Sequence, residues 1–330
     1  MVRSSLNKNS WGGTEQIAQK MVDSIDKNIL AQFQIVFSRL TEPLDASKVR
    51  IFYCHDLADD PYSEQALGNG NWKNFHKIVF VSHHQMNQYI KKYSLPSSVC
   101  IVMLNAIEPL DINVLDRASS TSPIRIGYWS TPHRGLEILV PVFDLLAREY
   151  DIELDVYSSF EIYGWGERDK PYQQLFDKCR SHEKINYYGS VPNAQLRKSL
   201  ADIDIMGYPS IWEETSCLCL MEAMSAGILP VHSNLGALYE TAANWTVMYQ
   251  YMEDPQQHAA TFYQAMKFAI ENVCTNDMVG RLQAQKSYAD SFYNWQVRKT
   301  QWEALLVSLL NVDRSLPEST GPKWSYQIKV

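Results

Sequence analysis

The sequence lacks any apolar run long enough to span a lipid bilayer, and it has no stretch with the pattern of a signal peptide. It also lacks internal repeats and low-complexity tracts. Its six cysteines are scattered, and none belongs to the pair of CxxC motifs that typically binds zinc. This cysteine usage favours free thiols in a reducing compartment, so we expect a cytoplasmic protein without a metal site.

A basic block is also missing. The chain has 30 Lys and Arg against 37 Asp and Glu, which gives a net charge of −7. This balance argues against nucleic acid as the main partner. The first 110 residues carry 11 basic and 10 acidic side chains and are the part least repelled by an anionic surface. We therefore also consider a peripheral position on the inner face of a membrane.

Hydrophobic residues make up 45% of the 330 residues, which is enough for two domains with buried cores. Apolar strand-like runs alternate with helical segments, and this pattern is typical of an α/β fold whose parallel sheets are covered on both faces. A polar linker at 111–123 divides the pattern. The expected strands are 31–37, 49–55, 77–83, 99–104, 124–130, 152–158, 184–192, 228–233 and 245–250.

The segment from Tyr208 to Gly227 carries the strongest signal. Glu214 and Glu222 stand eight positions apart, and Thr215-Ser216 between them predicts the start of a helix. The N-terminus of a helix favours a phosphate group, and an ionised carboxylate accepts hydrogen bonds from a diol. The segment could therefore bind a hexose, a diphosphate and a ribose. The alternative interpretation is two ordinary glutamates, solvated or in salt bridges.

Two other places are candidates for ligand contacts. Gly12-Gly13 precedes a helix expected at 14–25, where backbone amides could approach a phosphate, although a plain flexible loop is the alternative. His55 follows the strand expected at 49–55, and ligands bind beyond the carboxyl ends of parallel strands. A structural, hydrogen-bonded histidine is the alternative there. Adjacent His83 and His84 have no suitably spaced carboxylate, so we favour a structural role for them.

These residues resemble the retaining nucleotide-sugar glycosyltransferases of family 4. The signature of that family is Glu, seven residues, Glu, then Ala-Met and a glycine, and here Glu222 is followed by Ala223-Met224 and Gly227. The resemblance implies the GT-B architecture, in which two Rossmann-like, doubly wound domains face a cleft. We expect the domains at 1–110 and 111–310, the last helix crossing back to the first domain, and a tail at 311–330.

The resemblance also implies an activity: transfer of a sugar from a nucleotide-sugar donor to a hydroxyl of a saccharide or lipid-linked acceptor, with retention and without a metal or cofactor. In this family the departing phosphate takes the acceptor's proton. The implied catalytic residues are Glu214 on the transferred sugar, Arg134 on the diphosphate and His55 near the sugar. The implied donor-binding residues are Glu222 on the ribose, Val191 near the base, and Gly12, Gly13, Ser216, Cys217 and Ser130 around the phosphates.

The sequence departs from the family at two points. No apolar strand precedes Gly12, so the first strand of the first domain is missing, is replaced by another segment, or lies upstream of Met1; Trp324 to Val330 has strand character. Tyr128 stands where the family has an arginine that holds the donor diphosphate, so either one phosphate charge is left unmatched or Ser130, Thr131 or His133 helps Arg134. Two alternatives therefore stay open: a sugar-nucleotide epimerase of the same fold, and a degenerate, non-catalytic sugar-nucleotide-binding subunit.

Overall fold

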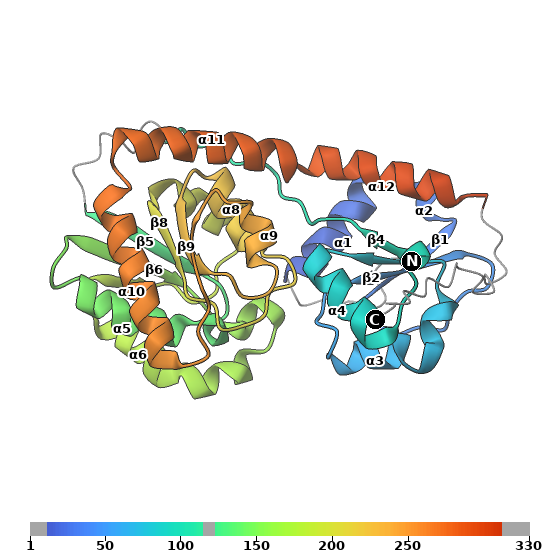
Figure 1. Cartoon of the computed structure of the whole chain (residues 1–330), viewed down its shortest axis with the longest axis horizontal. Helices are drawn as coiled ribbons and strands as arrows, with labels where there is room; N and C mark the ends of the chain where they lie inside the picture. Colours follow the sequence, from blue (N-terminus) through green and yellow to red (C-terminus); the bar gives the residue numbers. More distant parts are fainter. Residues whose placement is uncertain (1–11, 115–122, 312–330) are drawn as a thin grey trace, which may run out of the picture. The chain divides into compact units, whose positions relative to one another are not determined.

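The computed structural model describes residues 12–114 and 123–311, which form two compact units (Figure 1). Of these residues, 18–103 and 299–311 belong to the first unit, and 12–17 and 104–298 belong to the second. The sequence predicts a division at residue 110, and the structure assigns the chain to the second unit from Leu104 onward. Residues 311–330, expected as a tail, and Trp324–Val330 lie almost entirely outside the described residues.

The first unit contains a four-stranded parallel sheet in the order β1-β2-β3-β4. The strands follow one another in chain order, without a reversal among the described residues. They are β1 (Phe33–Phe37), β2 (Val49–Cys54), β3 (Lys77–Phe80) and β4 (Cys100–Val102). The helices are α2 (Lys27–Leu30), α3 (Pro61–Leu67), η1 (Gly68–Asn74), α4 (His83–Tyr93), η2 (Ser97–Val99), most of α1 (Gly13–Ser24) and most of α12 (Trp295–Leu309).

Strand β2 shows why this sheet needs cover on both faces. All six of its residues are buried, and successive side chains of a strand point to opposite faces. Phe52 packs against Phe75 on one face, whereas Tyr53 meets Trp302 of α12 with ring centroids 5.0 Å apart. The end of α12 is therefore part of the core of the first unit.

The second unit contains a six-stranded parallel sheet in the order β10-β9-β8-β5-β6-β7. The chain moves outward from β5 in one direction and then returns to build the other half, so the order reverses between β5 and β8. This is the doubly wound order expected from the sequence. The strands are β5 (Ile124–Trp129), β6 (Ile152–Tyr157), β7 (Ile185–Tyr187), β8 (Ile205–Tyr208), β9 (Leu229–Ser233) and β10 (Val247–Tyr249).

Helices cover this second sheet around a core that includes Ile126, Leu154, Ile205 and Leu229. Helix α8 packs against α11, and α5 packs against α10 (Figure 1). The helices are η4 (Pro132–Arg134), α5 (Leu136–Leu146), η5 (Phe160–Tyr163), η6 (Gly166–Tyr172), α6 (Gln173–Ser181), α7 (Asn193–Ser199), η7 (Leu200–Asp202), α8 (Leu218–Ser225), α9 (Leu238–Ala242), α10 (Pro255–Asn272) and α11 (Asn276–Phe292).

The two parallel sheets confirm the predicted α/β fold class. One expected detail is wrong: the helix predicted to start at Thr215-Ser216 begins at Leu218, two residues after Ser216. Among residues 12–114 and 123–311 the first sheet consists of β1 to β4, and the segment before Gly12 lies outside the described residues. Within those same ranges, no helix combines the length and the apolar character needed to cross a membrane.

A buried histidine in the second sheet makes stability depend on pH. Burial lowers the pKa of His232 to about 4, and its Nε2 and Nδ1 lie 2.8 Å and 2.7 Å from the Thr246 hydroxyl and the Ser233 carbonyl. The unfolded chain binds this proton near pH 6.5, so stability is complete above that pH and is lost as the pH falls towards 4. At pH 5 the loss for one such residue is about 2 kcal/mol.

We predict that His232→Asn, although less stable at pH 7, loses less stability between pH 7 and pH 5 than the wild type. Urea unfolding at each pH measures this slope. His83→Asn, at the exposed start of α4, is the control for removing a histidine. Equal slopes in the wild type and His232→Asn would contradict the assignment.

Candidate donor-binding site

The topology of the second sheet determines where the candidate site lies. Strands β5 and β8 are neighbours, and the chain order reverses between them. Both strands are parallel, so the loops that follow them emerge at the same edge, which is where ligands bind in open α/β sheets. The loop after β5 carries Arg134, and the loop after β8 carries Glu214.

Glu214 is held by two donors that come from different elements. Its Oε1 oxygen accepts a hydrogen bond of 2.7 Å from Arg134 Nη1 and one of 2.6 Å from the hydroxyl of Tyr208, the last residue of β8. Burial alone would lower the pKa of Arg134, but the Glu214 carboxylate raises it above its ordinary value. The Oε2 oxygen of Glu214 receives no hydrogen bond from the described residues and stays available to a ligand.

Two glycines allow the backbone to bring this pair together. Gly135 has φ +114°, and a Cβ atom there would lie 2.1 Å from the carbonyl oxygen of Pro209. Gly236 has φ +64°, and a Cβ atom there would lie 2.5 Å from the backbone nitrogen and oxygen of Glu214. Glu214 also forms a bridge with Gly236, and its carbonyl accepts from Ala237 N at 2.7 Å. Only glycine fits both positions.

The N-terminus of α8 has no side-chain oxygen cap, as is also true of α5, α6, α7 and α9. Side chains cap α2, α3, α4, α10 and α11, but Cys217, the N-cap residue of α8, provides no such hydrogen bond. Four buried polar atoms in the two loops also lack a hydrogen-bond partner in the described structure: Arg134 Nε, His133 Nδ1, Ser216 Oγ and Thr131 Oγ1. Free amides, hydroxyls and a guanidinium are groups that bind a phosphate.

Gly12 and Gly13 lie close to this region. A Cβ atom on Gly12 would be 2.3 Å from Cε1 of Tyr163, and one on Gly13 would be 2.9 Å from Cδ1 of Leu218, the first residue of α8. Tyr163 ends η5, and burial raises its pKa while the charge of Arg134 lowers it. The glycine pair therefore packs against the start of α8, and Tyr163 is a neighbour that the sequence does not indicate.

Glu222 is held in a similar way to Glu214. It is 7% exposed, and its Oε1 oxygen accepts a hydrogen bond of 2.7 Å from Nη1 of Arg197 on α7. The second amino group of Arg197 donates to the carbonyl of Glu108 at 2.6 Å. Burial raises the pKa of Glu222, and Arg197 opposes that rise. Oε2 of Glu222 again receives no hydrogen bond from the described part of the chain.

The structure gives Tyr128 a structural role. Its side chain is fully buried, and its hydroxyl donates to the carbonyl of Thr131 at 2.7 Å. It therefore brings no positive charge in place of the family's arginine. His133 does not supply that charge either, since burial first, and then Arg134 and Arg168, lower its pKa to about 4. Arg134 is thus the cation that pairs directly with Glu214.

The remaining predicted residues lie elsewhere. His55 belongs to the first unit, at the end of β2, where its ring contacts Tyr53 and Phe37 and burial lowers its pKa to about 3. Val191, after β7, is half-buried against the core of the second unit. Ser130 follows β5 directly. In residues 12–114 and 123–311, neither Ser130 nor Val191 shares a hydrogen bond with Glu214 or Glu222.

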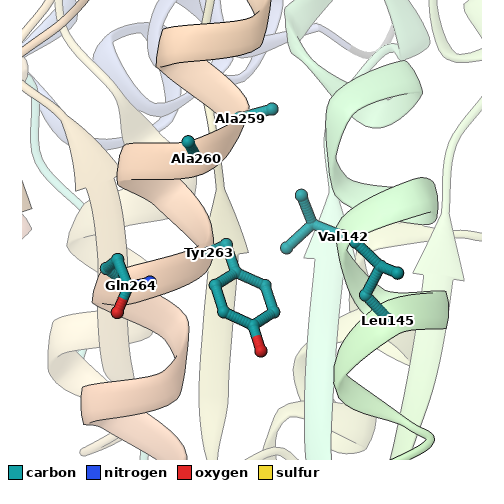
Figure 2. Close-up of a pocket in the computed structure, with 6 residues that line it drawn as sticks. All are labelled: Val142, Leu145, Ala259, Ala260, Tyr263 and Gln264. Atoms are coloured by element: carbon teal, nitrogen blue, oxygen red, sulfur yellow. The ribbon is translucent and has the colours of Figure 1, made fainter.

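Two further features contribute nothing to this site. An apolar groove between α5 and α10, lined by Val142, Leu145 and Tyr263 among others, contains none of the predicted residues (Figure 2). Within the described ranges, no three or more His, Cys, Asp or Glu side chains are grouped to hold a metal ion. Asp204, near the end of η7, accepts a hydrogen bond from Arg125 N at 2.9 Å and is structural.

Comparison with known families identifies the segment that carries this geometry. Residues 130–286 match the model described as "Glycosyl transferases group 1". The matched segment makes up just under half of the chain. It includes Arg134, Arg197, Glu214 and Glu222, and so it includes both buried carboxylates and the arginine that holds each of them.

Individual proteins are similar to the chain at low identity. The GPI3 subunit of phosphatidylinositol N-acetylglucosaminyltransferase from Saccharomyces cerevisiae is 24% identical over 186 residues, which cover 53% of this chain and 39% of the relative. The chain thus spans about two fifths of the length of that relative.

Solved structures show the same fold. A glycosyltransferase from Rickettsia africae superposes with a TM-score of 0.67 at 14% identity, covering 93% of this chain and 85% of the other. HepE from Anabaena, in complex with UDP and glucose, gives 0.65 at 13% identity, with coverage of 92% and 85%. These similarities confirm the GT-B fold.

Loop geometry at the site can be tested by stability. We predict that Gly135→Ala lowers the free energy of unfolding by about 3 kcal/mol, because it combines a disfavoured φ with a backbone clash. Gly280→Ala is the matched control: Gly280 is exposed on α11 with nothing near its Cβ position, so this change should stabilise the helix by about 0.5–1 kcal/mol. Equal effects in denaturant unfolding would refute the close approach of Gly135 to Pro209.

Proposed function

We propose that this protein is a retaining glycosyltransferase of family 4, which transfers a sugar from a nucleotide-sugar donor to a hydroxyl of a saccharide or lipid-linked acceptor. The observation that carries the proposal is the arrangement around α8. Two buried carboxylates, Glu214 and Glu222, each keep one oxygen without a donor among the described residues, and the start of α8, which has no side-chain oxygen cap, lies between them in sequence. A nucleotide-sugar has a hexose, a diphosphate and a ribose in the matching order.

In this proposal the donor is bound along that arrangement. Oε2 of Glu222 accepts from the ribose hydroxyls, and Oε2 of Glu214 accepts from a hydroxyl of the transferred sugar. The amides around Ser216 and Cys217 and the Nε of Arg134 donate to the diphosphate. Arg134 Nη1 already holds Glu214, so one guanidinium can contact both the carboxylate and a phosphate.

The chemistry assigned to these groups is stabilisation of charge. As the bond to the sugar breaks, negative charge develops on the leaving diphosphate, and preorganised donors such as Arg134 favour that state. The departing phosphate takes the acceptor's proton, as the resemblance implies, so no protein base is assigned. His55 is neutral at pH 7 because burial lowers its pKa to about 3, and we assign it contact with the sugar. The scheme uses no metal ion or cofactor.

The acceptor is proposed from the yeast relative. Its name makes phosphatidylinositol the acceptor and N-acetylglucosamine the sugar. We therefore propose a lipid-linked acceptor for this chain, which would act peripherally on the cytoplasmic face of a membrane. UDP-N-acetylglucosamine is the first donor to test, since UDP is bound in the Anabaena structure.

The donor site predicts a ligand-dependent gain in stability. A nucleotide-sugar at 100 times its dissociation constant should stabilise the wild type by about 2.7 kcal/mol in a thermal-shift screen without added metal. We expect Glu222→Ala to lose this shift, since it removes the acceptor for the ribose. An absence of any shift across uridine, guanosine and adenosine donors would favour the non-catalytic subunit instead.

Catalysis should depend on how Glu214 is held. We predict that Tyr208→Phe lowers kcat about 10-fold, because it removes a hydrogen bond to a charged group. Tyr128→Phe is the matched control, since Tyr128 is equally buried but its hydroxyl donates to a backbone carbonyl. Glu214→Gln should abolish transfer while free nucleotide still binds. If transfer survives in Glu214→Gln, this carboxylate has no role in the reaction.

A further inference from the structure

Arg197 connects three segments of the second unit that are far apart in the sequence. Its Nη1 donates to Glu222 on α8 at 2.7 Å, and its Nη2 donates to the carbonyl of Glu108 at 2.6 Å. Its own backbone belongs to α7. Arginine often binds a carboxylate with two parallel hydrogen bonds that use both oxygens. Here the carbonyl of Glu108 takes one amino group, and only one oxygen of Glu222 is used.

As a result, the two carboxylate oxygens of Glu222 have different environments. Oε1 is fixed by Arg197, and Oε2 has no donor among the described residues. The fixed oxygen determines the rotamer of the side chain and hence the position of the free oxygen. The side chains of Glu222 and Arg197 are 9% and 21% exposed, so both groups are largely removed from water.

Stability alone does not account for this pair. Removing two charges from water is costly, and replacing a buried ion pair by apolar residues is often neutral or stabilising. A buried carboxylate without a cation would tend to be protonated. A protonated carboxyl has an O–H donor in place of one acceptor site, so it can accept fewer hydrogen bonds. Arg197 therefore has a role in the nucleoside site of the proposed function: it keeps Glu222 ionised and oriented.

We propose that Arg197 is a positioning residue for the nucleoside, which fixes Glu222 so that its free oxygen accepts hydrogen bonds from the ribose hydroxyls of the donor. Arg197 itself does not touch the ligand. The proposal rests on the proposed function, because it needs a nucleotide at Glu222. Under this proposal, the preference for ribose over 2′,3′-dideoxyribose depends on Arg197, which lies 25 positions from Glu222 in the sequence.

The experiment compares two ligands that differ only in those hydroxyls. Calorimetry would measure the affinity of UDP and of 2′,3′-dideoxy-UDP, with the guanosine and adenosine pairs in parallel, for the wild type and for Arg197→Gln. We expect Arg197→Gln to weaken ribonucleotide binding about 10-fold and to leave dideoxynucleotide binding unchanged, because one hydrogen bond to a charged group is lost from the ribose site only.

Two further variants make the test specific. Arg197→Lys keeps a cation that can reach Glu222, but it cannot hold Glu222 and the Glu108 carbonyl with two separate amino groups. It should therefore retain part of the ribose preference. This variant also keeps the test measurable if Arg197→Gln fails to fold. Arg180→Gln removes an arginine from a surface ion pair with Asp177 in the same unit and should change neither affinity.

The outcomes separate this inference from the proposed function. Equal weakening of both ligands by Arg197→Gln would mean a purely structural role and would overturn the inference, as would unchanged binding of both. In either case the wild type still binds nucleotide, and the proposed function stands. If the wild type binds none of the ribonucleotides, the proposed function fails and the inference fails with it.

Discussion

The ion pair between Arg134 and Glu214 is the interaction on which the candidate site depends. It joins the loop after β5 to the loop after β8, at the point where the strand order of the second sheet reverses. The pair forms only because Gly135 and Gly236 let the backbone pass where a side chain would collide. Tyr208 adds a second donor to the same carboxylate oxygen. One contact therefore fixes two loops and leaves the other oxygen of Glu214 for a ligand.

The fold could be predicted from the sequence because its signal is local. Apolar runs such as β2, buried along its whole length, indicate a sheet covered on both faces, and the alternation with helices indicates parallel strands. The spacing of Glu214 and Glu222 drew attention to one segment, and the resemblance to family 4 added Arg134; all three residues fall within 130–286, which matches the family model. The spacing is a local feature of the chain, whereas Arg134 was found only through the resemblance.

The rest depends on contacts between distant segments. Thr215-Ser216 has the chemistry of a helix start, but the bridge between Glu214 and Gly236 holds the chain extended there, so α8 begins at Leu218. Tyr208 follows no pattern that distinguishes it from Tyr128, although only the hydroxyl of Tyr208 reaches Glu214. A tertiary contact thus overrides the local propensity in the first case and selects the functional tyrosine in the second.

The two buried carboxylates, Glu214 and Glu222, are held by the same kind of interaction. A buried carboxylate is costly unless it is paired, but a fully paired one has nothing left to offer a ligand. Glu214 and Glu222 each use Oε1 for an arginine and keep Oε2 free of protein donors, in the described part of the chain. The arginines come from different elements, η4 and α7, so the arrangement is not a consequence of one local motif. In the proposed function one extended donor contacts both oxygens, with Glu214 four residues before the start of α8 and Glu222 in its second turn.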